Sequence, residues 1–164
     1  MTQKYNIAVA GATGAVGAEI VQILEQRDFP IENLFLLASS KSKGKKVEFR
    51  GEEIVVEDLS EFDFSKAHIS LFSPGGKISA EYAPKAANAG CIVIDNTSHF
   101  RMKQNIPLIV PEVNAHILDE FFDDENRTNI ISNPNCSTIQ MVVALKPLHE
   151  KAIINRVVVS TYQA

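Results

Sequence analysis

Short apolar runs alternate along the chain with segments whose apolar residues recur at helical spacing. Runs typical of buried strands occupy residues 5–10, 34–39, 68–72, 91–95 and 129–131. Helical patterns follow the first, third and last of these runs, over about residues 18–24, 77–89 and 136–148. Strands that alternate with helices favour a parallel sheet with helices on its faces. The pattern therefore predicts an α/β fold.

Other segments give weaker or different signals. Residues 47–56 alternate around a central glycine and predict a small hairpin. Pro84 suggests a kink or a break in the alanine-rich helix, and residues 102–127 predict a connecting region with one helical turn from Ala115. Residues 153–161 are strongly β-branched and predict a strand. Because a buried strand seldom closes a domain, we expect the chain to be part of a longer protein.

The first strand is joined to the first helix by a glycine-rich turn. Gly11, Gly14 and Gly17 stand three residues apart, a variant of the spacing found in dinucleotide-binding turns. Gly11 suits a tight turn, Gly14 lets a pyrophosphate approach the backbone, and Gly17 lets the helix pack on the strand. The same turn also occurs in proteins without a ligand, but a phosphate-binding P-loop is disfavoured because no Gly-Lys-Ser/Thr follows. The turn predicts a Rossmann-like doubly wound parallel sheet that binds a dinucleotide.

The end of the second strand carries the signal for the type of cofactor. NAD sites commonly have an acidic residue there, whereas this chain has Ser39, Lys41 and Ser42. Hydroxyl groups and positive charge favour the 2′-phosphate of NADP, although a solvated basic loop is the alternative. Ser73 and Gly75 follow the next strand of the sheet, in a loop whose glycines allow a ligand close to the backbone.

A cysteine stands where the last predicted strand turns into a helix. Asn135 is a good helix N-cap and Pro134 cannot donate a helical hydrogen bond, so the helix is predicted to begin at Cys136. Backbone N–H groups at a helix start stabilise a thiolate and can hold an oxyanion, which makes Cys136 a candidate nucleophile. The alternative is a small buried hydrophobic residue. Cys91 fits that alternative, because it lies in a strand-forming run without polar neighbours.

Composition excludes several classes of protein. The chain has 164 residues, 45% hydrophobic and 22% charged, with a formal net charge of −4. Basic residues are outnumbered and scattered, so no nucleic-acid partner is expected. Two cysteines in different settings do not form a disulfide framework, and no apolar run is long enough for a signal peptide or a membrane span. We expect a cytoplasmic protein without a membrane or metal site.

Several motifs together carry a resemblance to a known family. Arg101 closes a polar run after the strand at 91–95, at the carboxyl edge where doubly wound folds keep their ligands. The whole chain resembles aspartate-semialdehyde dehydrogenase in the stretches 11–17, 38–42, 95–102, 110–114, 133–138 and 160–163. A sister family that reduces N-acetyl-glutamyl phosphate typically has Pro-Gly-Cys-Tyr around its cysteine, where this chain has Pro-Asn-Cys-Ser.

The resemblance implies a two-domain enzyme that interconverts L-aspartyl 4-phosphate and L-aspartate 4-semialdehyde with NADP(H), in lysine, threonine and methionine biosynthesis. Cys136 would form a thioester, Gln163 would help to position the substrate, and Arg101 with Asn135 would bind its phosphate. The cofactor-binding residues would be Gly11, Thr13, Gly14, Ala15, Val16, Ser39, Lys41, Ser42, Ser73 and Gly75. The family usually has arginine at the position of Lys41, so we expect a weaker grip on the 2′-phosphate.

The resemblance also divides the chain. Residues 1–130 would form the NADP-binding Rossmann domain, and 131–164 would begin an incomplete α+β catalytic and dimerisation domain. The catalytic histidine and a second arginine would lie beyond this chain, which we therefore expect to have no turnover by itself. The complete family members would be homodimers or dimers of dimers. The alternatives are an N-acetyl-γ-glutamyl-phosphate reductase-like enzyme and a non-catalytic nucleotide-binding module.

Overall fold

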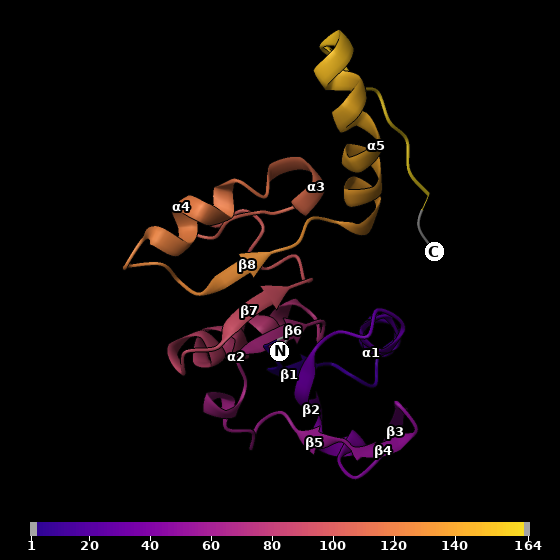
Figure 1. Ribbon diagram of the computed structural model, residues 1–164, viewed down its shortest axis with the longest axis vertical. Coiled ribbons are helices and arrows are strands. Elements are labelled where there is room, and N and C mark those ends of the chain that lie inside the picture. Colours follow the sequence, from indigo (N-terminus) through magenta and orange to yellow (C-terminus); the bar gives the residue numbers. More distant parts are fainter. Residues whose placement is uncertain (1–2, 163–164) are drawn as a thin grey trace.

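The computed structural model describes residues 3–162 and is built on one six-stranded sheet (Figure 1). All its strand pairs are parallel, in the order β5-β2-β1-β6-β7-β8. The strands are β1 (Tyr5–Ala10), β2 (Ile31–Ala38), β5 (Glu57–Asp58), β6 (Ile69–Phe72), β7 (Ile92–Asp95) and β8 (Ile130–Ser132). From β1 the sheet extends to β2 and β5 on one side and, later in the chain, to β6, β7 and β8 on the other. The order therefore reverses between β1 and β6, as in a doubly wound fold, and the prediction of a Rossmann-like sheet is confirmed.

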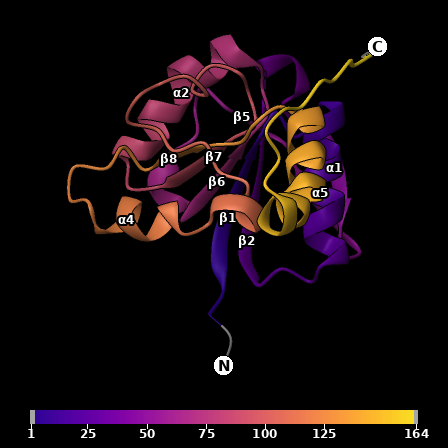
Figure 2. The same cartoon turned by 90° about the horizontal axis from the view of Figure 1, so that it is seen from above.

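Helices cover both faces of this sheet. The two that pack on it are α1 (Ala15–Gln26) and α2 (Gly76–Asn88). The other helices of the described residues are α3 (Pro111–Asn114), α4 (Ile117–Asp123) and α5 (Cys136–Ala152), with 3-10 helices η1 (Ser40–Ser42) and η2 (Phe64–Lys66). Alternate residues of β1 point to opposite faces. Ala8 and Ala10 join the core under α2, whereas Ile7 and Val9 join the core under α1. Figure 2 shows these two helices on opposite sides of the sheet.

The hairpin and the alanine-rich helix follow their sequence signals. β3 (Lys46–Phe49) and β4 (Glu52–Val55) pair antiparallel, and Arg50 and Gly51 between them both have positive φ, 52° and 78°. Positive φ at both central residues is the mark of the turn that suits a twisted hairpin. α2 continues through Pro84, so the expectation of a break there is wrong.

The predicted strand at residues 153–161 is wrong. This segment has no regular structure and is largely exposed, with 80% of Val158 accessible to solvent. It returns along α5, because Ile154 and Val157 line one hollow with Val142 and other residues of that helix (Figure 1). β-branched residues form a strand only when a neighbouring strand takes their hydrogen bonds, and within residues 3–162 none pairs with this segment.

The connecting region and the last helix also differ from the expectation. The single helical turn predicted from Ala115 is replaced by α3 and α4, which lie on either side of that residue. α5 begins at Cys136 as predicted, but none of its residues is fully buried. Its apolar spacing predicted a packed helix, and its apolar side is only half covered by the residues that the structure describes. No helix within residues 3–162 is long and apolar enough to cross a membrane.

Candidate functional site

The glycine turn between β1 and α1 is built by very close packing. Gly11 has φ +84°, and its amide donates to the Leu37 carbonyl oxygen of β2 at 2.8 Å. A Cβ atom at Gly17 would lie 2.1 Å from the Gly11 carbonyl oxygen, and a Cβ at Gly11 would lie 2.9 Å from the backbone of Ser73. Side chains at these two positions would collide with backbone. The roles predicted for Gly11 and Gly17, a tight turn and helix packing, match this geometry.

The start of α1 is open. Its N-cap residue, Gly14, has no side chain that could cap the helix, and the first turn carries no acidic residue. Ala15 and Val16, in that first turn, are exposed. Unpaired N–H groups and the positive end of the helix dipole are a general binding site for phosphate. Among the described residues, the cradle of Gly11, Gly14 and Gly17 therefore fits the pyrophosphate of a dinucleotide.

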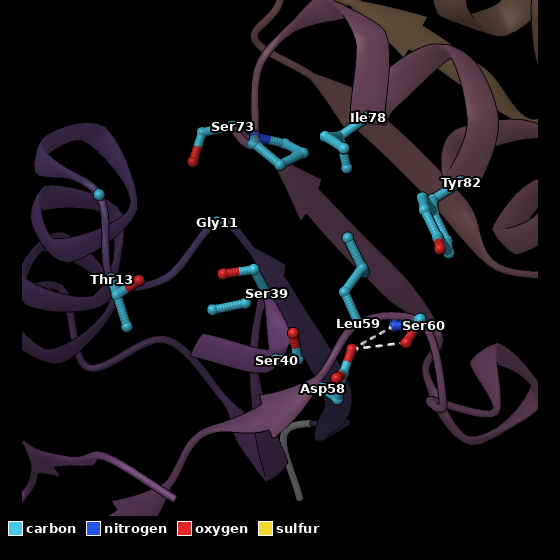
Figure 3. Close-up of a pocket in the computed structure, with 13 residues that line it drawn as sticks. Gly11, Thr13, Ser39, Ser40, Asp58, Leu59, Ser60, Ser73, Ile78 and Tyr82 are labelled. Atoms are coloured by element: carbon cyan, nitrogen blue, oxygen red, sulfur yellow. Dashed lines mark hydrogen bonds between the residues drawn. The ribbon is translucent and has the colours of Figure 1, made fainter. Parts of the chain in front are cut away.

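A cavity of about 450 Å³ opens beside this turn (Figure 3). It lies at the carboxyl ends of β1, β2, β5 and β6, where the strand order reverses. In open α/β sheets this crevice is the usual place for a ligand. Its lining residues are Gly11, Thr13, Gly14, Ala38, Ser39, Ser40, Asp58, Leu59, Ser60, Ser73, Pro74, Ile78 and Tyr82.

Half of the residues predicted for the cofactor line this cavity. They are Gly11, Thr13, Gly14, Ser39 and Ser73. The other five, Ala15, Val16, Lys41, Ser42 and Gly75, lie within two residues of a lining residue in the chain without lining the cavity themselves. Ser42 is tied to the turn, because the Thr13 hydroxyl donates to its hydroxyl oxygen at 3.4 Å.

The basic cluster after β2 is partly neutralised. Lys43 pairs with Glu61 at 2.5 Å and Lys46 pairs with Glu53 at 2.6 Å. Glu61 raises the pKa of Lys43, first by accepting its hydrogen bond and then by its charge. Among the ion pairs within residues 3–162, none involves Lys41, which sits exposed in η1. Lys45 is also in none of these ion pairs, but Lys41 directly follows Ser40, which lines the cavity, and is the cation of this cluster best placed to meet a ligand there.

Sequence reasoning missed the far wall of the cavity. Asp58 comes from β5, a strand of two residues that no periodicity reveals, and Tyr82 comes from α2. The Asp58 carboxylate accepts hydrogen bonds from the Ser60 hydroxyl at 2.7 Å and the Ser60 amide at 2.9 Å, which lower its pKa. This wall thus adds a charged carboxylate and a half-buried aromatic ring to the glycine turn. The only sequence signals were that Asp58 follows the predicted hairpin at 47–56 and that Tyr82 lies in the predicted helix at 77–89.

Cys136 occupies the first position of α5, as predicted. The Asn135 side-chain oxygen accepts from the Ser137 amide at 2.9 Å, which is the expected N-cap bond. The Cys136 thiol is exposed. The alternative of a small buried hydrophobic residue is therefore wrong for this cysteine.

Arg101 is anchored to the segment that leads to Cys136. Its Nε donates to the Asn133 carbonyl oxygen and its Nη2 donates to the Asn96 carbonyl oxygen, both at 2.9 Å. The two asparagine side chains are also bonded to each other at 2.6 Å. The guanidinium group is thus fixed against Asn133, which lies three residues before Cys136 in the chain. Gln163, the remaining predicted catalytic residue, lies outside the described residues.

Cys91 is the opposite kind of thiol. It is completely buried, and burial raises its pKa to about 11. Its sulfur lies 2.8 Å from the Ser70 hydroxyl oxygen on the neighbouring strand β6. The expectation of no polar neighbours is therefore wrong, because a partner across the sheet cannot be seen in the local sequence. Within residues 3–162, no group of three or more His, Cys, Asp or Glu side chains could hold a metal ion.

One edge of the sheet thus carries all the candidate groups. The open glycine turn and its cavity lie at the ends of β1, β2, β5 and β6, and Arg101 and Cys136 follow β7 and β8. A dinucleotide cradle at the switch point of a doubly wound sheet is typical of a nucleotide-binding domain of the Rossmann class. The family comparison agrees: residues 6–121 match the family described as semialdehyde dehydrogenase, NAD binding domain, and the chain belongs to that family.

Individual proteins that this chain is similar to are named aspartate-semialdehyde dehydrogenase. The chain is 55% identical over 164 residues to aspartate-semialdehyde dehydrogenase 2 of Vibrio cholerae, covering 100% of this chain and 48% of that protein. A Vibrio cholerae aspartate semialdehyde dehydrogenase II crystal structure, complexed with ASA, has a TM-score of 0.85 at 55% identity, over 90% of this chain and 47% of that one. A Candida albicans aspartate semialdehyde dehydrogenase structure with NADP has a TM-score of 0.76 at 27% identity, over 93% and 48%. The predicted resemblance is confirmed, and the chain spans about half the length of these relatives.

The two cysteines should differ sharply toward a thiol alkylator. At pH 8 a thiol with a pKa of about 11 is ionised in only about one molecule in a thousand, and Cys91 is also shielded. Brief treatment with iodoacetamide should label Cys136 at least about tenfold faster than Cys91, as read by peptide mass spectrometry. In urea the two rates should converge. Faster labelling of Cys91 in the folded protein would contradict the assignment of Cys136 as the reactive thiol.

Proposed function

We propose that this chain supplies the cofactor site and the nucleophile of an NADP-dependent aspartate-semialdehyde dehydrogenase. The observation that carries the proposal is the shared carboxyl edge of the sheet, which holds both the glycine turn with its cavity and, after β8, an exposed cysteine at a helix start. Family membership and relatives of that name support the same activity. The reaction interconverts L-aspartyl 4-phosphate and L-aspartate 4-semialdehyde in amino-acid biosynthesis.

NADP is the cofactor we propose for the cavity. The family is a NAD-binding domain, and the Candida albicans relative was solved with NADP. Gly14 and the open start of α1 would receive the pyrophosphate, with Thr13, Ala15 and Val16 around it. Ser39, Lys41 and Ser42 would face the 2′-phosphate, while Ser73 and Gly75 would approach the nucleotide from the loop after β6. NADPH, when bound, supplies the hydride for the reduction.

The substrate phosphate would be held next to Cys136. The Nε and Nη2 groups of Arg101 donate to backbone carbonyls, which within the described residues leaves Nη1 of the guanidinium group free to bind an oxyanion. A guanidinium group matches phosphate geometry and is already immobilised, so little entropy is lost on binding. Asn135, whose side chain also caps α5, would contribute from the other side of the thiol.

Cys136 would carry the acyl group. Its thiolate attacks the acyl carbon of aspartyl phosphate, the carbon–oxygen bond to phosphate breaks, and inorganic phosphate leaves with that electron pair. The product on the protein is a thioester, which reduction and loss of the thiolate convert to the semialdehyde. Backbone N–H groups at the start of α5 are placed to stabilise the oxyanion formed at each addition. Gln163 would orient the substrate, whose class is supported by the Vibrio cholerae complex with ASA.

We further propose the division of labour that the resemblance implies. Residues 1–130 would bind the cofactor and 131–164 would begin the catalytic and dimerisation domain, although β8 itself completes the sheet of the first. The acid/base histidine and the second substrate arginine would come from the remaining length that the relatives possess. A homodimer or dimer of dimers in the cytoplasm fits this family, and both cysteines are free as that compartment requires.

Replacing Lys41 should change cofactor preference. The wild type should bind NADPH more tightly than NADH, because Lys41 has no carboxylate partner among the described residues. Lys41→Glu should weaken NADPH binding by about tenfold and leave NADH within about twofold. Fluorescence titration of both cofactors measures this, and Lys45→Glu is the control with the same change in net charge. Equal affinities for both cofactors in the wild type would count against NADP.

Acyl transfer to Cys136 can be tested apart from turnover. Acetyl phosphate, a simple acyl phosphate, should form a thioester on Cys136 that neutral hydroxylamine removes, as read by intact-mass and peptide analysis. Cys136→Ser should lack this adduct, Cys91→Ser should keep it, and Arg101→Gln should form it about tenfold more slowly because the leaving phosphate loses its partner. If the hydroxylamine-sensitive adduct is absent from wild-type Cys136, the proposed mechanism is wrong.

A further inference from the structure

A carboxyl group that the proposed reaction does not use lies buried at the end of β7. Asp95 is 0% exposed. Within residues 3–162 it has no cationic partner, and instead one oxygen accepts from the Ser79 hydroxyl at 2.5 Å and the other from the Thr97 hydroxyl at 2.7 Å. A buried acidic group is costly unless its hydrogen bonds are satisfied. The sheet core alone has no need of it, since an apolar residue would fill the same place.

The two hydroxyl groups belong to different parts of the site. Ser79 lies in α2, the helix whose Ile78 and Tyr82 line the cofactor cavity. Thr97 lies in the irregular loop between β7 and α3 that carries Arg101. The Asp95 side chain therefore connects the wall of the cofactor cavity to the loop of the phosphate-binding arginine.

The backbone of Asp95 makes the third connection. Its carbonyl oxygen accepts from the Asn133 amide at 2.8 Å, and Asn133 is the residue whose own carbonyl binds Arg101. Asn96, the other carbonyl partner of Arg101, follows Asp95 directly. Ser132, in register with Asp95 on β8, is also buried, and its hydroxyl is the one buried side-chain N or O atom without a partner among the described residues. This corner of the sheet is thus polar well beyond the needs of packing.

We propose that Asp95 is a positioning residue of the active site. Its buried carboxyl group holds the loop of Arg101 in place relative to the cofactor cavity, and its backbone carbonyl binds the segment before Cys136. The proposal rests on the proposed function, which makes Arg101 and Cys136 parts of one site. The loop of residues 96–101 has no helix or strand of its own to fix it. Its bonds to Asp95 and to Asn133 help to set where the guanidinium group stands. The Asn96 amide, which donates to the Phe72 carbonyl oxygen, and the buried Phe100 side chain fix the loop further.

The test measures the position of Arg101 through the reactivity of Cys136. Iodoacetate is an anion and iodoacetamide is neutral, so the ratio of their rates at Cys136 reports the nearby positive charge and not the exposure of the thiol. Arg101→Gln gives the ratio without that charge. Because replacement of Asp95 itself endangers folding, the test variant is Thr97→Val, which removes one hydroxyl bonded to the carboxyl group. Thr97→Ser retains that hydroxyl.

Thr97→Val should lower the iodoacetate-to-iodoacetamide ratio by about threefold, most of the way to the Arg101→Gln value. Thr97→Ser, which retains the hydroxyl, should have the ratio of the wild type. Ser70→Ala is the control, because it removes another buried hydroxyl, one on β6 that is bonded to Cys91, and should leave the ratio unchanged. Ser79→Ala, which breaks the other bond, should weaken NADPH binding by about threefold.

The outcomes separate the two proposals. If Arg101→Gln lowers the ratio but Thr97→Val and Ser79→Ala both behave as the wild type does, Asp95 is not a positioning residue and the proposed function stands. If Arg101→Gln itself has no effect, Arg101 does not act at Cys136, and the phosphate assignment falls together with the role of Asp95. An equal drop in Ser70→Ala would mean that any buried hydroxyl has the same effect, which also overturns the inference.

Discussion

The contact between Gly17 and the Gly11 carbonyl oxygen determines how this molecule is built. A Cβ at Gly17 would stand only 2.1 Å from that oxygen, so α1 rests on the end of β1 with no side chain between them. This approach aims the N–H groups of the helix start at the crevice where the strand order reverses. Gly11 in turn lies against the backbone of Ser73, which brings the loop after β6 to the same crevice. These two close contacts thus shape both sides of the cavity.

The parallel sheet explains why the cysteine shares this edge. Every strand of a parallel sheet ends on the same side, so residues that follow different strands gather there whatever their separation in sequence. Arg101 after β7 and Asn133 after β8 meet in this way, because backbone carbonyls of Asn96 and Asn133 hold the guanidinium group. Cys136 follows Asn133 by three residues. The cavity at β1 and the thiol at β8 are separated by β6 and β7. Asp95, on β7, is the polar connection between the two halves.

Features that depend on local geometry could be predicted from the sequence. The glycine turn and the helix that begins at Cys136 are each determined by a few adjacent residues, through positive φ at Gly11 and the side-chain cap of Asn135. Contacts between distant segments could not. Asp58 comes from a two-residue strand, and Cys91 meets Ser70 only across the sheet. Residues 153–161 have strand-forming side chains, but a strand also needs a partner, and none of the described residues supplies one.

Hydrogen–deuterium exchange with and without saturating NADPH tests most directly whether this crevice is the dinucleotide site. Bound ligand slows exchange where it shields or orders backbone amides. Peptides that cover residues 11–17 and 73–82 should exchange more slowly with NADPH, because both line the cavity. The hairpin at residues 46–55, which takes no part in that lining, should be unchanged. Unaltered exchange at residues 11–17 with NADPH demonstrably bound, or protection confined to the hairpin, would contradict the account.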